Sequence, residues 1–175
     1  MRRAVFLDRD GTLNHLVPRG DGSWASPRAA AEFELAAGAE EVVARLKKAG
    51  FLVLVATNQP DVARGFLSPA QLEEMHRLLA TRLAVDEILV CPHDDADGCA
   101  CRKPLPGMLL EAARRRAIDL GRSFMVGDSW KDMEAARRAG VTGILIAAEY
   151  NQEVTCGLRA ESLESACDYI LRQGR

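Results

Sequence analysis

The sequence predicts an α/β fold, a three-layer sandwich in which a parallel sheet lies between two layers of helices. Short apolar segments alternate along the chain with amphipathic segments, as in repeated strand–helix units. The apolar segments are continuously apolar, which is typical of parallel strands covered on both faces. The length of 175 residues fits one domain that spans residues 1–175.

Each expected strand is a short apolar run. The strands are expected at 3–7, 51–58, 86–90, 123–127 and 142–148. The helices are expected at 39–50, 67–83, 106–118, 130–140 and 161–173. In the second of these helices, Ser68 fits the N-cap, Pro69 the first helical position and Gln71 a capping box.

The segment 14–36 is rich in proline and glycine and lacks a regular pattern. It is too short for a separate domain, so we expect either a flap over the functional site or a surface loop. The other segments between strands are short and assigned to regular structure. We therefore expect no large cap over the site.

The composition argues against nucleic-acid and membrane partners. The formal net charge is −2, and no apolar segment reaches the ~20 residues of a membrane span. The first residues lack the apolar stretch of a signal peptide. We expect a cytoplasmic monomer that acts on a small molecule. The odd number of cysteines, five, favours reduced thiols over a disulfide framework.

Polar residues directly follow several of the expected strands. In open parallel sheets, ligands bind at this place, beyond the carboxyl ends of the strands. Those that follow successive strands are Asp8, Asp10, Gly11 and Thr12, then Thr57 and Asn58, then Arg102 and Lys103, then Asp128 and Asp132. Neighbouring carboxylates form a hard oxygen site suited to Mg²⁺, and cations and hydroxyls suit phosphoryl oxygens. This combination predicts phosphoryl transfer.

Each residue type has a role in such a reaction. Asp8, at the end of its strand, would attack phosphorus and form an aspartyl-phosphate. Asp10 would protonate the leaving oxygen and later deprotonate water. Thr57 and Lys103 would hold the transferring oxygens, and Gly11 lets backbone amides approach the phosphoryl group.

The stretch CPHDDADGCACRKP, residues 91–104, gathers candidate metal ligands. Cys91, His93, Cys99 and Cys101 predict a structural Zn²⁺ site, because three thiolates and one imidazole suit tetrahedral zinc. Four protein ligands leave no open position for catalysis. A disulfide between Cys91 and Cys99 is the alternative.

The segments FLDRDGTLN, VATNQP, CRKP and MVGDSWKDM resemble the four motifs of the haloacid dehalogenase-like phosphatases, from about Val5 to Ile146. The resemblance implies a Rossmann-like core with the first strand central, and Mg²⁺-dependent catalysis with Asp8 as nucleophile. It implies Asp8, the Asp10 carbonyl and Asp128 as magnesium ligands. Asp132 would support the metal site or Lys103.

The cysteine loop narrows the resemblance to two capless subgroups that carry such a loop. These are the D-glycero-D-manno-heptose-1,7-bisphosphate 7-phosphatases and the histidinol-phosphate phosphatases. The segment KPLPGMLL favours the heptose subgroup, and histidinol phosphate or another sugar phosphate stays the alternative substrate. The expected substrate contacts are Gly11, Thr12, Asn58, Gln59, Arg64 and Arg102. Arg102 could bind the second phosphate of a bisphosphate, since a guanidinium binds phosphate bidentately.

The sequence supports two other functions less well than it supports a phosphatase. A scaffold with a vestigial site would not need every catalytic position intact. A phosphate-accepting receiver domain would need neither Asp10 nor the cysteine loop. Of the histidines outside that loop, His76 is expected to face solvent on its helix.

Overall fold

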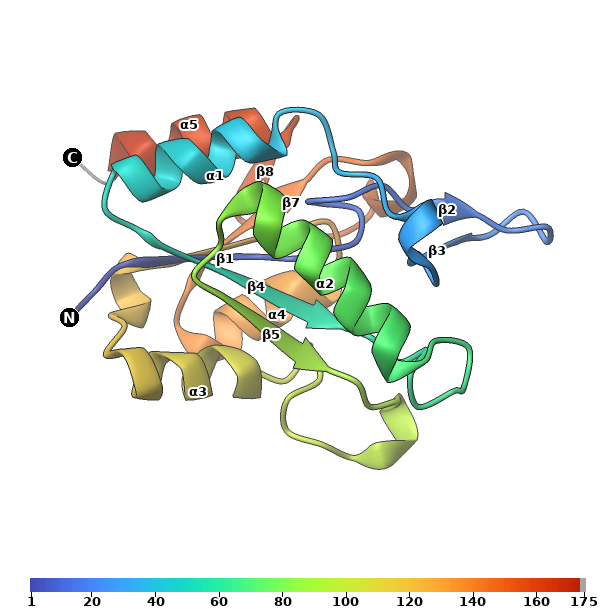
Figure 1. Cartoon of the computed structure of the whole chain (residues 1–175). Helices are drawn as coiled ribbons and strands as arrows, with labels where there is room; N and C mark the ends of the chain where they lie inside the picture. Colours follow the sequence, from blue (N-terminus) through green and yellow to red (C-terminus); the bar gives the residue numbers. More distant parts are fainter. Residues whose placement is uncertain (174–175) are drawn as a thin grey trace.

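Residues 1–173 are described by the computed structural model, and within them a six-stranded parallel sheet is flanked by helices on both faces (Figure 1). The strand order is β5-β4-β1-β6-β7-β8. The strands are β1 (Ala4–Leu7), β4 (Leu52–Asn58), β5 (Glu87–Cys91), β6 (Phe124–Gly127), β7 (Thr142–Ile146) and β8 (Arg159–Ala160). The predicted fold class is confirmed.

The two helical layers pack on opposite faces of the sheet (Figure 1). One layer consists of α1 (Ala39–Lys48), α2 (Pro69–Leu83) and α5 (Leu163–Gln173). The other consists of α3 (Gly107–Arg116) and α4 (Trp130–Ala139). Short 3₁₀ turns complete the chain at η1 (Ala30–Glu32), η2 (Asp95–Asp97), η3 (Leu120–Arg122) and η4 (Glu149–Asn151).

The central strand β1 shows why its sequence is continuously apolar. Val5 and Leu7 pack in the core beneath α1, α2 and α5, whereas Ala4 and Phe6 pack in the core beneath α3 and α4. Side chains alternate between the two faces of a strand, and here both faces are covered. All four side chains are fully buried.

Helix α2 begins as the sequence predicts. The Ser68 hydroxyl accepts a hydrogen bond from the Gln71 amide at 3.2 Å, and Gln71 Oε1 accepts one from the Ser68 amide at 3.0 Å. This reciprocal capping box satisfies two backbone donors that a helix start leaves free.

The structure adds elements that the sequence does not predict. The edge strand β8 has two residues, too few for an apolar run to be recognised. The segment 14–36 contains a two-stranded antiparallel sheet of β2 (Val17–Pro18) and β3 (Trp24–Ala25), which projects beyond the sheet in Figure 1. No helix of the described chain combines the length and apolar character that crossing a membrane requires.

Candidate active site

The carboxyl ends of three neighbouring strands bring the predicted residues together. β1 lies between β4 and β6, so the residues that follow these strands are neighbours in space. Asp8 follows β1, and its amide donates to the Val126 carbonyl at 2.9 Å. Thr57 lies near the end of β4, and Asp128 follows β6.

Lys103 reaches this edge from the loop after β5 and is almost fully buried. Its Nζ donates to Asp8 Oδ1 at 2.7 Å, to Asp132 Oδ1 at 2.5 Å and to the Ala56 carbonyl at 2.7 Å. Burial by itself lowers the pKa of Lys103, but the charges of Asp132 and Asp8 outweigh it and raise the pKa above its usual value. Lys103 is therefore a fixed cation beside Asp8.

Asn58 positions Lys103 through its backbone. The Asn58 side-chain Nδ2 donates to the Lys103 carbonyl at 2.9 Å, and its Oδ1 accepts from the Lys103 amide at 3.1 Å. Asn58 was expected to contact substrate, but both its amide nitrogen and its amide oxygen are hydrogen-bonded to the Lys103 backbone.

Three carboxylates form a compact acidic cluster. Oxygens of Asp8, Asp128 and Asp132 all lie within 4.8 Å of one another. Burial, together with the neighbouring charges of Asp132 and Asp128, raises the pKa of Asp8 well above its ordinary value despite Lys103. Burial and the charge of Asp132 raise the pKa of Asp128 to about 6 although Tyr150 donates to its Oδ2. Hard oxygen ligands that repel one another in a buried site fit a divalent cation such as Mg²⁺.

Gly11 makes room for this cluster. Its φ is +81°, and a Cβ atom at this position would lie 2.1 Å from Asp128 Oδ2. Only glycine combines this backbone conformation with so close an approach.

The carboxylate of Asp10 is held by a buried network. Arg9 donates from Nε and Nη2 to its two oxygens, at 3.0 Å each. Asn14 Nδ2 and Gln59 Nε2 add hydrogen bonds at 3.0 and 2.7 Å. Burial raises the pKa of Asp10, but the Arg9 charge and these hydrogen bonds outweigh it and lower the pKa. The carboxylate is thereby fixed in orientation.

A cavity of about 230 Å³, the catalytic cavity, opens at this edge. Its lining residues are Asp8, Asp10, Leu16, Ser26, Asn58, Pro60, Arg102, Lys103, Ser129, Lys131 and Asp132. Thr57 is buried beside it and accepts from Gln59 Nε2 at 2.9 Å. Gly11 and Thr12 line a neighbouring cavity of about 700 Å³. Arg64 was expected to contact substrate, but it lines neither cavity and pairs with Asp94 through two 2.7 Å hydrogen bonds.

The cysteine loop, residues 91–101, folds its four candidate ligands into one cluster. The Sγ atoms of Cys91, Cys99 and Cys101 lie 3.2–3.5 Å apart, and His93 Nδ1 lies 3.4 and 3.7 Å from Cys101 and Cys91. These separations are close to the edges, about 3.8 Å, of a tetrahedron with ~2.3 Å zinc–sulfur bonds. Burial raises the pKa of Cys91 to about 12, so a cation is needed to make it a thiolate ligand. Within residues 1–173 every cysteine is free, which contradicts the disulfide alternative.

Comparison with known proteins identifies the family. The haloacid dehalogenase-like hydrolase family matches residues 23–140, which is more than half of the chain. A D-glycero-beta-D-manno-heptose-1,7-bisphosphate 7-phosphatase of Bordetella bronchiseptica is 42% identical over 149 residues, covering 82% of this chain and 80% of that protein. The Escherichia coli K12 protein of the same name is 37% identical and covers 96% of this chain and 87% of that protein.

The chain belongs to the haloacid dehalogenase-like hydrolases.

Solved structures agree with this assignment. The D,D-heptose 1,7-bisphosphate phosphatase of B. bronchiseptica, crystallised with magnesium and phosphate, superimposes on this hydrolase with a TM-score of 0.84. It is 36% identical, and the match covers 98% of this chain and 99% of that one. A putative phosphatase of the same superfamily from Mesorhizobium loti gives a TM-score of 0.81 at 32% identity, covering 99% of this chain and 88% of that one.

Several residues that shape the site of this hydrolase are not predicted from its sequence. Arg9 is fully buried and His76 is 8% exposed, with 3.1 Å between Arg9 Nη1 and His76 Nε2. The expectation that His76 faces solvent is therefore wrong, because its helix turns it toward the Arg9 guanidinium. Tyr150 donates to Asp128 Oδ2, and Asn151 Nδ2 donates to the Asp128 carbonyl at 2.7 Å. For Arg9, the one sequence signal is its place between two aspartates at the end of a buried strand.

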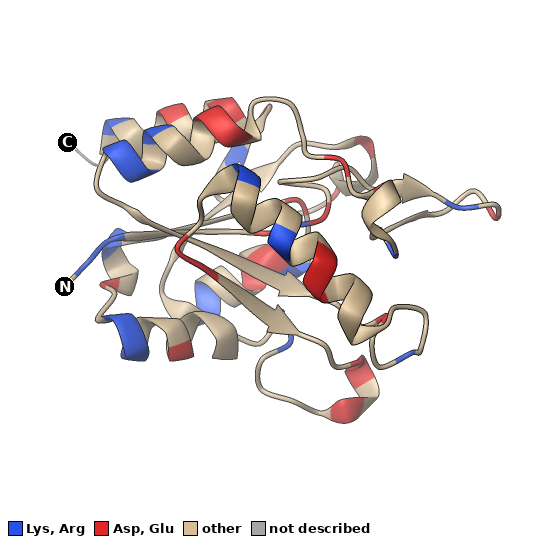
Figure 2. Ribbon diagram, in the orientation of Figure 1, with Lys and Arg blue, Asp and Glu red and all other residues tan. Residues whose placement is uncertain are grey.

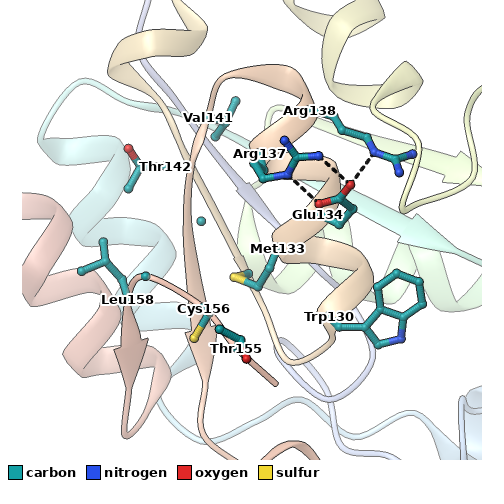
Figure 3. Close-up of a pocket in the computed structure, with 12 residues that line it drawn as sticks. Trp130, Met133, Glu134, Arg137, Arg138, Val141, Thr142, Thr155, Cys156 and Leu158 are labelled. Carbon is teal, nitrogen blue, oxygen red and sulfur yellow. Dashed lines mark hydrogen bonds and ion pairs between the residues drawn. The ribbon is translucent and has the colours of Figure 1, made fainter. Parts of the chain in front are cut away.

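A cavity of about 840 Å³ lies away from this chemistry, between α4 and the edge of β7 (Figure 3). Trp130 and Met133 border it, and Glu134 there is paired with Arg137 and Arg138. The hydrolase therefore has its acidic cluster in a smaller cavity than this one.

Proposed function

We propose that this hydrolase is a phosphatase that removes the 7-phosphate of D-glycero-D-manno-heptose 1,7-bisphosphate through an aspartyl-phosphate on Asp8. The observation that carries the chemistry is Lys103 Nζ at 2.7 Å from Asp8 Oδ1. The pair places a buried cation beside a carboxylate at a strand end, where phosphoryl oxygens need a counter-charge. The relatives named above support the substrate.

The metal site follows from the acidic cluster. A magnesium ion held by Asp8, Asp128 and the Asp10 carbonyl would offset the repulsion between the Asp8 carboxylate and a phosphate dianion. In this proposal Asp132 acts through Lys103, to which it is hydrogen-bonded at 2.5 Å.

The reaction then proceeds in two displacements. The Asp8 carboxylate attacks phosphorus as the bond to the sugar oxygen breaks, and that oxygen takes its proton from Asp10, which has to bind this proton before the step. Asp10 next takes a proton from water, whose oxygen attacks the same phosphorus and frees Asp8 and inorganic phosphate. Lys103 and Thr57 hold the phosphoryl oxygens throughout.

The cysteine loop has a structural role in this proposal. Cys91, His93, Cys99 and Cys101 would hold Zn²⁺, and the bound ion would make rigid a loop that leads directly into Arg102 and Lys103. The enzyme acts as a cytoplasmic monomer on a small phosphorylated molecule, without a nucleic-acid or membrane partner. Gel filtration tests its oligomeric state.

Phosphate release tests the assignment. The purified protein with MgCl₂ is expected to hydrolyse heptose 1,7-bisphosphate in strong preference to histidinol phosphate, and Asp8→Asn is expected to be inactive on both. A higher kcat/KM on histidinol phosphate would show that the substrate is wrong. Turnover that survives Asp8→Asn would show that the mechanism is wrong.

A further inference from the structure

An exposed acid is paired with an arginine that lines the catalytic cavity. Arg102 lines this cavity, and its side chain is 8% exposed. Its Nε donates to Asp95 Oδ1 at 2.6 Å, while the Asp95 side chain is 70% exposed. Asp95 lies in the acidic turn η2 of the cysteine loop, which is red in Figure 2. An exposed carboxylate is thus paired with a buried guanidinium.

A second cation lines the same cavity as Arg102. Lys131, in the first turn of α4, also lines the catalytic cavity. The hydrogen bond and the charge of Arg102 lower the pKa of Asp95, and the charge of Lys131 adds to this effect. Asp95 is therefore the paired anion of Arg102, while Lys131 is a second cation that lines the same cavity from α4.

Arg102 is held in place without Asp95. Its Nη1 donates to the His93 carbonyl at 3.2 Å, and its Nη2 lies 4.0 Å from Asp94 Oδ1, beyond hydrogen-bond distance. A guanidinium has five N–H donors, and the two hydrogen bonds to Asp95 and His93 leave others for a ligand. Loss of the Asp95 contact would leave Arg102 anchored to the backbone of the cysteine loop.

We propose that Asp95 sets substrate specificity: its carboxylate is paired with Arg102 in the free enzyme and is displaced by the second phosphate of a bisphosphate. This inference rests on the proposed function, since it needs a substrate with a phosphate outside the reacting position. An ion pair with an exposed partner contributes little, so its displacement costs little. A phosphate offers more charge and bidentate geometry to the same guanidinium. Substrates with one phosphate do not displace Asp95.

Steady-state kinetics of Asp95→Asn test the proposal. The matched control is Asp168→Asn, which removes an exposed carboxylate paired with Arg45 at 2.5 Å between α1 and α5. For heptose 1,7-bisphosphate, Asp95→Asn is expected to lower KM by about two- to fivefold, the range that an exposed ion pair supplies. For p-nitrophenyl phosphate, which carries only the reacting phosphate, KM is expected to stay unchanged. The control variant is expected to match wild type on both substrates.

An unchanged or higher KM for the bisphosphate would overturn the proposal, since Asp95 would then be idle or would orient Arg102. An equal fall in KM for both substrates would also overturn it, because that pattern is a general charge effect.

A binding experiment separates this inference from the proposed function. In the Asp8→Asn background, calorimetry compares fructose 1,6-bisphosphate with fructose 6-phosphate, with and without Asp95→Asn. If Asp95→Asn tightens the binding of fructose 1,6-bisphosphate but not that of fructose 6-phosphate, the role of Asp95 is supported. This result would hold even if wild type does not hydrolyse the heptose substrate. If Asp95→Asn changes the affinity for both ligands equally, or for neither, the role of Asp95 is contradicted.

Discussion

Lys103 and Asp8, 95 positions apart in the sequence, meet in a buried ion pair with 2.7 Å between Nζ and Oδ1. The same ammonium group lies 2.5 Å from Asp132 Oδ1. Lys103 therefore joins the nucleophile of the proposed reaction to the carboxylate in the first turn of α4. The pair neutralises part of the acidic cluster while no phosphate is bound.

Replacing Lys103 should impair both catalysis and stability. Lys103→Met leaves Asp8 and Asp132 buried without their cation, which is expected to lower the free energy of unfolding by about 3–5 kcal/mol without metal. Loss of a donor to the phosphoryl oxygens is expected to lower kcat/KM by about 10²–10³-fold. Urea titration and phosphate release measure the two effects. MgCl₂ should restore part of the stability but not the activity.

Lys47→Met is the control for this variant. Lys47 pairs with Asp86 at 2.9 Å while 35% exposed, so its loss should cost about 1 kcal/mol or less. Equal stability losses in the two variants would contradict the special role of the buried pair.

Arg9 should act on the rate through Asp10. Arg9→Lys keeps a positive charge but loses the two parallel N–H groups that hold the Asp10 carboxylate. If that orientation serves proton transfer, kcat is expected to fall by about 10–100-fold with KM nearly unchanged. A rise in KM with kcat preserved would contradict a positioning role. Arg45→Lys, at an exposed pair, should match wild type.

Buried His76 should make the fold sensitive to acid. Burial and the Arg9 charge lower the pKa of His76 from 6.5 to about 4. Arg9 can only donate, so His76 Nε2 accepts and must be unprotonated. Between these pH values the folded form binds fewer protons than the unfolded chain, so the free energy of unfolding falls as pH drops from about 6.5 toward 4. The loss reaches up to about 3 kcal/mol.

Urea unfolding of His76→Gln between pH 7 and pH 4.5 tests this. The variant is expected to lose less stability over that range than wild type. His15→Gln, which changes an exposed histidine, should keep the wild-type dependence. Identical slopes for His76→Gln and wild type would refute the assignment.

The fold, and the gathering of acids and Lys103 at one edge of the sheet, were predictable because each depends on a local signal. Continuous apolar runs identified the strands, and Ser68 with Gln71 identified the start of α2. Parallel strands bring their carboxyl ends to one edge, so Asp8 and Asp128 could be placed at the same edge of the sheet, and the family resemblance made them ligands of one metal ion.

What could not be predicted depends on tertiary contacts. In the sequence, Arg9 cannot be told from an exposed arginine in the loop after a strand. Its complete burial depends on partners from other segments, including His76 of α2. Tyr150 meets Asp128 across a loop that no sequence pattern fixes. The pairing of Arg64 and Arg102 with acids of the cysteine loop likewise appears only in three dimensions.

Loss of a proposed zinc ligand should reduce activity indirectly. Cys101 immediately precedes Arg102 and Lys103, so Cys101→Ser is expected to release zinc and misplace Lys103. We expect about one zinc per chain in wild type by metal analysis, much less in the variant, and a clear fall in kcat. Cys156→Ser, outside the cluster, should retain both zinc and activity. Full activity of a zinc-free variant would contradict a structural role for the loop.

Borohydride trapping during turnover reports on the proposed aspartyl-phosphate itself. Borohydride reduces an acyl phosphate on aspartate to homoserine, which peptide mass spectrometry locates. We expect homoserine at position 8 when heptose 1,7-bisphosphate is turned over with MgCl₂, and unmodified Asp8 without substrate. Continued turnover with homoserine at another aspartate, or at none, would contradict it.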